Sequence, residues 1–202
     1  MEARADVTTD SREQLLAEAY CLRAFVHFDL INLYAKWYDP ATAATDKAVP
    51  LSLKIDIGQS FIPTTVEKVY EQVLADLQEA EKYMQVEQQT GAYLYRFSKK
   101  ALKAFQARVY LYHQDWKQAQ ETAESLLAAC PLEDLTTTEA QPWTYTSKEA
   151  ILALETVSST VMKEDMYVLD NISGKFNQIK EGDKYVDARL GNYLVDKYGT
   201  WY

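Results

Sequence analysis

The sequence is poor in the residues that interrupt or crosslink a chain. Its 202 residues include only six glycines, five prolines and two cysteines. So few glycines and prolines favour long regular elements over a succession of turns. Cys21 and Cys130 lie far apart without a CxxC motif and are interpreted as small buried hydrophobic residues. Only two histidines are present and there is no HExxH motif, so neither a structural zinc site nor a cofactor is expected.

Positive charge is also scarce. Lysine and arginine number 21 against 30 acidic residues, which leaves a net charge of −9 at neutral pH. A chain this acidic repels nucleic acid and anionic lipid, so both are excluded as partners. No apolar run approaches the ~18 residues of a membrane-spanning helix. The polar first residues, MEARADVTTDS, lack the apolar core of an export signal.

The dominant feature that is present is a long apolar helix, expected over about residues 11–37. Its apolar residues form two stripes at helical spacing, which predicts burial on two sides against neighbouring helices. Arg23 and His27 lie one turn apart on this helix. They could form an acid–base pair, but a buried structural pair is the favoured interpretation. The first stripe is Leu15, Ala19, Leu22, Val26, Leu30, Leu33 and Trp37, and the second is Ala24, Phe28, Ile31 and Ala35.

Three more helices follow an irregular connection over residues 39–63. The second is predicted from a capping box with Thr64 as N-cap and Glu67 as its partner. Ser98 is the expected N-cap of the third helix, over residues 99–113. After a tight turn, Asp115 caps a fourth helix that ends before Pro131, and the two form an αα-hairpin. The buried face expected for the second helix consists of Val66, Tyr70, Val73, Leu77, Ala80 and Met84.

The pattern weakens beyond residue 130. Residues 147–154, SKEAILAL, fit either a short strand or a helical turn, and residues 187–198 are expected to form a last short helix. The expected organisation is a helical scaffold over residues 1–130 and an irregular, loop-rich segment over residues 131–202, both within one domain. The predicted fold class is mainly α, with helix pairs and long irregular loops.

Five segments in a fixed order resemble the SusD/RagB family, the glycan- and nutrient-binding surface lipoproteins of the Bacteroidetes outer membrane. The resemblance covers residues 15–127, and residues 147–154 also look like the segment that follows in the family. No single segment is specific, but their order is. The segments are LRAFVHFDLINLYAKW, the loop VPLSL, the helix VYEQVLADLQEAEKYM after Pro-Thr-Thr-Val, the tetratricopeptide-like pair SKKALKAFQARVYLYHQDWKQAQETAESLL, and SKEAILAL.

The resemblance implies a tetratricopeptide-like scaffold and a non-catalytic function. The expected function is the capture of an oligosaccharide or other nutrient for a TonB-dependent porin at the cell surface. Membrane attachment would require a lipid anchor, and the sequence has neither lipobox nor signal peptide. An internal piece of a longer protein is therefore expected. Ala35 also departs from the glycine that the family often has at the helix exit. The alternative function is a helical-repeat module that binds only a protein partner.

Sugar binding requires flat aromatic rings for C–H faces and polar groups for hydroxyls. Trp37, Tyr38 and Asp39 at the exit of the first helix are the first candidates, although Trp37 also continues an apolar stripe. Tyr93 and Tyr95 are the second candidates, and both could equally be ordinary loop residues. Trp143 and Tyr145 are weaker candidates, and Trp116 is expected in the core.

No enzymatic activity is expected. Neither His27 nor His113 has a nucleophile motif nearby, and no Gly-rich phosphate loop is present. Carboxylates paired only in the folded structure stay open as an alternative, because the spacing of a glycosidase pair is set in space.

Overall fold

The structure is a computed structural model that describes residues 11–54, 58, 61–130, 132–134 and 147–154, and the backbone of two short strands. Within this part of the chain the elements are α1 (Arg12–Tyr34), α2 (Val66–Tyr83), the 3-10 turn η2 (Gly91–Tyr93), α3 (Lys99–Tyr112), α4 (Trp116–Leu127), β1 (Lys180–Glu181) and β2 (Lys184–Tyr185). The mainly α class predicted from the sequence is confirmed. No helix among the described residues is both long and apolar enough to cross a membrane.

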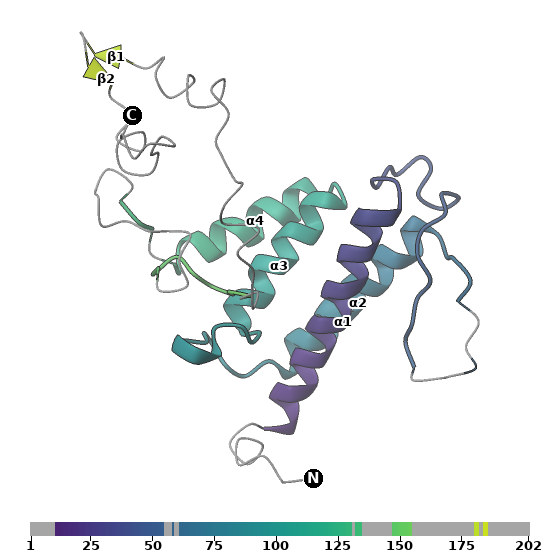
Figure 1. Ribbon diagram of the computed structural model, residues 1–202, viewed down its shortest axis with the longest axis horizontal. Coiled ribbons are helices and arrows are strands. Elements are labelled where there is room, and N and C mark those ends of the chain that lie inside the picture. The colour runs from purple at the N-terminus through teal and green to yellow at the C-terminus, as the bar shows by residue number, and fades with distance from the viewer. Residues whose placement is uncertain are drawn as a thin grey trace, which may run out of the picture. The chain divides into compact units, whose positions relative to one another are not determined.

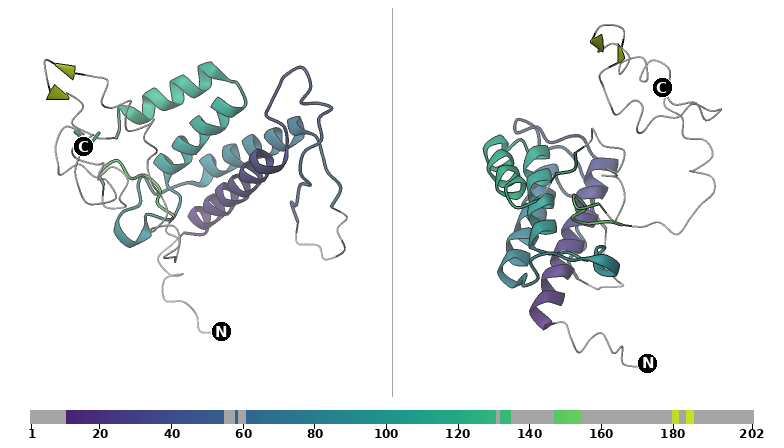
Figure 2. Two further views of the ribbon diagram at one scale, coloured as in Figure 1. Left: turned by 45° about the horizontal axis from the view of Figure 1, so that its top comes forward. Right: turned by 90° about the vertical axis from the view of Figure 1, so that its left-hand side faces the viewer.

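Helices α1 and α2 form an antiparallel pair, which Figures 1 and 2 show side by side. The pairing is visible in contacts at both ends and in the middle. Gln14 bonds to Met84, Arg23 bonds to Asp76, and the ring of Phe28 lies against that of Tyr70. Helix α1 begins where the Ser11 side chain accepts the Gln14 amide, which satisfies one of its free N–H groups.

Helix α2 has the face that its sequence predicts. All six residues of the expected stripe, from Val66 to Met84, are buried. The predicted N-cap was wrong by one residue, because Thr65 is the cap and its side chain accepts the Lys68 amide. Thr64 instead exchanges backbone hydrogen bonds with Ala48 and Val49 across a short antiparallel bridge. The carbonyls of residues 43 and 46 accept the first two amides of α2, so the preceding connection also caps the helix.

Helices α3 and α4 form the predicted hairpin (Figure 1). Ser98 accepts the Ala101 amide and so caps α3 as expected. Gln114 adopts a positive φ of 67° in the turn, which reverses the chain within three residues. Asp115 is the N-cap residue of α4, but its side chain bonds to His113 rather than to an α4 amide.

The core lies between α1, α2 and α3. Phe28 is at its centre, edge-on to the rings of Tyr70, Phe105 and Tyr112 at centroid distances of 6.4, 5.5 and 5.3 Å. Such edge-to-face arrangements are favourable beyond the apolar area that they bury. The remaining buried apolar residues include Ala17, Cys21, Ala24, Ile31, Val69, Leu77, Leu102 and Val109. Burial raises the pKa of the Cys21 thiol to about 12.

The expectation that α1 is buried on two sides was wrong. Its first stripe, defined here as the α1 stripe, is largely exposed at Leu15, Leu22, Val26, Leu33 and Trp37. The second stripe is buried at Ala24, Phe28 and Ile31, and the same side of the helix also holds buried polar residues. The helix also ends at Tyr34, three residues earlier than expected, so Trp37 lies outside it. The α1 stripe therefore offers an apolar surface rather than a second core.

The chain divides into two compact units, Met1–Ala129 and Cys130–Tyr202. In the second unit, residues 147–150 form a turn closed by a bond from the Ala150 amide to the Ser147 carbonyl, not a strand. Strands β1 and β2 pair antiparallel, with Lys180 opposite Tyr185. The helix expected over residues 187–198, and the aromatic candidates Trp143 and Tyr145, lie outside the described residues.

Candidate functional site

The three residues predicted at the exit of α1 have different environments. Trp37 is 87% exposed, so its ring is available to a ligand. Asp39 organises the turn that follows, because its carboxylate accepts the Ala41 amide and its carbonyl accepts the amides of Thr42 and Ala43. Of the three, Trp37 is the side chain that the fold does not already use.

Tyr38 belongs to an aromatic cluster that joins three elements. Its ring lies 4.1 Å from that of His113 and 5.2 Å from that of Tyr70, centroid to centroid. Its carbonyl accepts a hydrogen bond from Gln114, which ties the exit of α1 to the hairpin turn. Burial, together with the nearby carboxylate Glu67, raises the pKa of the Tyr38 phenol. The hydroxyl therefore stays neutral and can donate or accept a hydrogen bond.

Tyr93 and Tyr95 are both more than half exposed, on either side of the buried Leu94. This loop is held by Arg96, whose guanidinium donates to Glu18 of α1 at 2.9 and 3.0 Å. Glu18 and the exit of α1 are separated by about 24 Å of helix, at 1.5 Å per residue. The two predicted aromatic candidates are thus at opposite ends of α1 and form separate surfaces.

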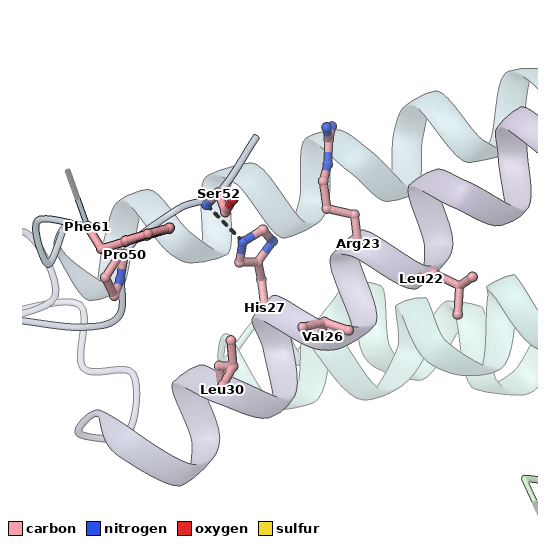
Figure 3. Close-up of a pocket in the computed structure, with 8 residues that line it drawn as sticks. All are labelled: Leu22, Arg23, Val26, His27, Leu30, Pro50, Ser52 and Phe61. Atoms are coloured by element: carbon pink, nitrogen blue, oxygen red, sulfur yellow. Dashed lines mark hydrogen bonds between the residues drawn. The ribbon is translucent and has the colours of Figure 1, made fainter. Parts of the chain in front are cut away.

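A groove of about 510 Å³ lies between α1 and the connection that follows it, and is called here the α1 groove. Figure 3 shows three aliphatic residues along the helix, facing residues of the connection. The lining is almost wholly apolar, and Phe61 contributes an exposed ring. The residues from the helix are Leu22, Val26 and Leu30, and those from the connection are Pro50, Ser52 and Phe61.

Arg23 and His27 also line the α1 groove, but they are not paired with each other. Arg23 donates two hydrogen bonds, at 2.8 and 2.6 Å, to Asp76 of α2, which is 1% exposed. His27 Nε2 accepts the backbone amide of Ser52 at 3.3 Å (Figure 3). Because that nitrogen accepts, the neutral ring carries its proton on Nδ1. The expectation of a buried structural pair was therefore wrong, because each residue bonds to a different partner and only His27 is buried.

The hydrogen bond from Ser52 to His27 attaches the connection to α1, and this contact is sensitive to acid. Burial lowers the pKa of His27 below its ordinary 6.5, and the nearby Asp76 only partly opposes this. A folded-state pKa below the unfolded value means that His27 contributes stability above pH ~6.5, which is lost as the pH falls through the folded-state pKa. Urea unfolding from pH 7.5 down to pH ~5 should therefore show a larger loss of stability for the parent than for His27→Gln, which does not titrate. Equal losses would contradict this.

A second groove, of about 490 Å³, lies between α3 and α4 and is called here the hairpin groove. Trp116 lines it and is 61% exposed, so the expectation that Trp116 is in the core was wrong. Tyr112, which follows Phe105 and Val109 at helical spacing, is half exposed and also lines the groove. Periodicity placed both rings on apolar faces, but it could not show that no further helix covers those faces in the described structure.

Comparison with known proteins identifies the family to which the helical part is similar. Residues 1–111 match the family model SusD-like, described as "Starch-binding associating with outer membrane". A curated relative, "SusD-like protein P38" from Formosa agariphila, is 33% identical over 120 residues. The matched region is 57% of this chain and 21% of that relative, so this chain spans about a fifth of the relative's length.

Solved structures agree with this match. A SusD superfamily protein from Bacteroides fragilis superposes with a TM-score of 0.60 at 26% identity, covering 77% of this chain and 37% of that one. Another from Bacteroides vulgatus gives a TM-score of 0.54 at 27% identity, covering 61% and 28%. The family match covers more than half of the sequence and confirms the resemblance drawn from the ordered segments. This chain belongs to the SusD-like family.

Proposed function

We propose that this chain is part of a non-catalytic surface protein that captures an oligosaccharide and delivers it to a TonB-dependent transporter of the outer membrane. The observation that carries the proposal is the match of residues 1–111 to a family described as starch-binding and associating with the outer membrane. The transporter partner and the surface location follow from the family resemblance and are part of the proposal.

The exposed aromatic residues of the first unit support glycan binding. Trp37, Tyr93 and Tyr95 present rings to solvent at either end of α1. A flat ring covers the C–H face of a sugar and leaves its hydroxyls free for hydrogen bonds. Tyr38 and Asp39 would contribute mainly by fixing the backbone beside Trp37. We therefore propose Trp37 as the principal contact at this end and the two tyrosines at the other.

The two histidines support a binding function rather than catalysis. His27 is occupied by the Ser52 amide, and His113 Nδ1 lies 2.8 Å from an Asp115 oxygen while its ring stacks on Tyr38. A general base must reach the proton that it removes and usually has a pKa near the working pH. The lowered pKa and buried position of His27 fit a structural role.

Titration with a panel of oligosaccharides tests the proposal. We expect Trp37→Ala to weaken binding about tenfold, the loss typical of a central aromatic contact. Tyr38→Phe should leave affinity unchanged, because the Tyr38 ring supports the fold and the variant keeps that ring. Calorimetry on folded protein, with circular dichroism as the folding control, measures both. A parent that stays folded and binds no member of the panel would refute glycan capture by this chain.

The α1 stripe favours a second candidate function, the binding of another polypeptide. Apolar side chains at helical spacing along about five turns, from Leu15 to Leu33, together with the aliphatic residues of the α1 groove, fit an amphipathic helix better than a sugar. A porin recovered in a pull-down, while glycans fail to bind, would support this candidate. Loss of that recovery in Leu22→Glu would assign the contact to the α1 stripe.

A further inference from the structure

The two grooves of the first unit are similar in volume and different in chemistry. The α1 groove, at about 510 Å³, is lined by leucine, valine, proline and one phenylalanine ring, and its polar side chains Arg23 and His27 already bond to Asp76 and Ser52. The hairpin groove, at about 490 Å³, has aromatic rings and long polar side chains along its sides. Both volumes are within the range of small-molecule sites, so the lining decides what each groove accepts. Aliphatic walls suit a polypeptide, whereas rings beside hydrogen-bonding groups suit a ligand with apolar faces and a polar rim.

The hairpin groove is built symmetrically from its two helices. Near the turn, α3 contributes Tyr112 and α4 contributes Trp116. One helical turn farther from the hairpin turn, α3 contributes Arg108 and α4 contributes Gln120. Each helix therefore supplies one exposed ring and, four residues away, one long polar side chain. The small side chains of three alanines leave the space between the helices open: Ala107, Ala119 and Ala123.

The polar groups are available to a ligand. Arg108 is exposed and makes no ion pair within the described part of the chain, so its guanidinium donors are free for an incoming acceptor. Gln120 donates one hydrogen bond to Glu124 at 2.7 Å, which orients its amide and leaves its carbonyl oxygen as an acceptor. No carboxylate lines the groove. Hydroxyls, which both donate and accept, match this set.

From this arrangement we propose that the hairpin groove is a second, separate oligosaccharide-binding site, which takes a neutral glucan through rings stacked on Trp116 and Tyr112 and through hydroxyls bonded to Arg108 and Gln120. The inference rests on the proposed function and adds a position to it. Tyr112 is anchored on one side by Phe28, at 5.3 Å between centroids, so its exposed part is presented rigidly. A preorganised ring loses little entropy when a ligand binds.

Nitrogen-15 NMR of the full chain tests the site, because each tryptophan indole N–H gives its own signal. The probe is maltoheptaose, and Trp116→Phe and Trp37→Phe assign the two signals. We expect the Trp116 signal to shift saturably, and to do so equally in Trp37→Ala. Arg108→Ala should weaken this titration about tenfold, whereas Leu127→Ala, an exposed change on α4 outside the groove, should leave it unchanged.

The outcomes separate the two proposals. A Trp37 signal that shifts while Trp116 stays still would overturn the hairpin site and leave glycan capture standing. A folded parent in which no indole shifts, and which binds no other glycan by calorimetry, would overturn both. A Trp116 titration that is unaffected by Arg108→Ala would also contradict the proposed site, because the polar half of the groove would then have no part in binding.

Discussion

Replacing Phe28 with alanine is expected to lower the free energy of unfolding by about 3–5 kcal/mol. Phe28 is 3% exposed and contacts rings from α2 and α3, so the smaller side chain loses apolar burial and leaves a cavity that rigid rings cannot fill. Urea denaturation followed by circular dichroism measures the effect. The urea concentration at the midpoint of unfolding should fall, and the dependence of the free energy of unfolding on urea concentration should stay unchanged.

Phe61→Ala is the matched control for this experiment. It deletes the same ring from a position where the side chain is mostly exposed, and should change the free energy of unfolding by less than about 0.5 kcal/mol. If the two variants were equally stable, Phe28 would not be at the centre of the core. Ligand affinity at the hairpin groove should also fall in Phe28→Ala, because the variant removes the ring that supports Tyr112.

Arg23 of α1 and Asp76 of α2 form an ion pair. Removing Arg23 should lower the free energy of unfolding more than removing Asp76 does. Arg23→Ala leaves the Asp76 carboxylate, which is 1% exposed, with Gln72 as its remaining donor among the described residues, and should cost about 3–5 kcal/mol. Asp76→Ala leaves a guanidinium whose side chain is 32% exposed and can reach water, so its cost should be smaller. The same denaturation measurement compares them.

The double variant completes the cycle. It should be more stable than the sum of the single changes predicts, because neither charge is then left without its partner. Lys36→Ala is the control, since it breaks an ion pair with Asp46 in which the lysine is mostly in solvent. The prediction would be contradicted if Arg23→Ala lowered the free energy of unfolding no more than Asp76→Ala does. The Asp76 carboxylate would then not need Arg23 as its partner.

Helix α2 was predictable residue by residue because its sequence has one apolar face. When only one stripe is apolar, that stripe must be the buried one. Helix α1 has two, and periodicity cannot rank them. The first stripe, with Leu22, Leu33 and Trp37, is exposed. The second is buried at Ala24, Phe28 and Ile31, and its Phe28 packs against rings of α2 and α3.

The polar residues inside the core explain why the rest could not be predicted. Gln14 is 2% exposed and occupies a core position because its amide bonds to Glu18, the Phe97 carbonyl and the amides of residues 85 and 86. Glu18 is satisfied by Arg96 in the same way. Apart from Glu18, which is four residues from Gln14, these partners are 71 to 83 residues away in the chain, so no local pattern reveals that a polar residue is satisfied there.

The exposure of the aromatic side chains was predicted in part for the same reason. The sequence located exposed rings correctly at Trp37, Tyr93 and Tyr95, because loops and helix exits are usually solvent-facing. It missed the hairpin groove, since Tyr112 and Trp116 have the spacing of core residues. A groove depends on which faces stay uncovered, and that is a property of the packed helices.

The distance in sequence between the partners of Phe28 has a consequence during synthesis. Helix α1 can pair with α2 only after the long connection has been made, and Phe28 meets Phe105 only after 77 more residues (105 minus 28) have been added. At about 5–20 residues per second, α1 waits roughly 4–15 s with its core face uncovered. The α3–α4 hairpin, closed by a three-residue turn, forms almost as soon as it emerges. Nascent α1, with apolar residues on both faces, is therefore a segment that a ribosome-associated chaperone would bind before α2 and α3 have emerged.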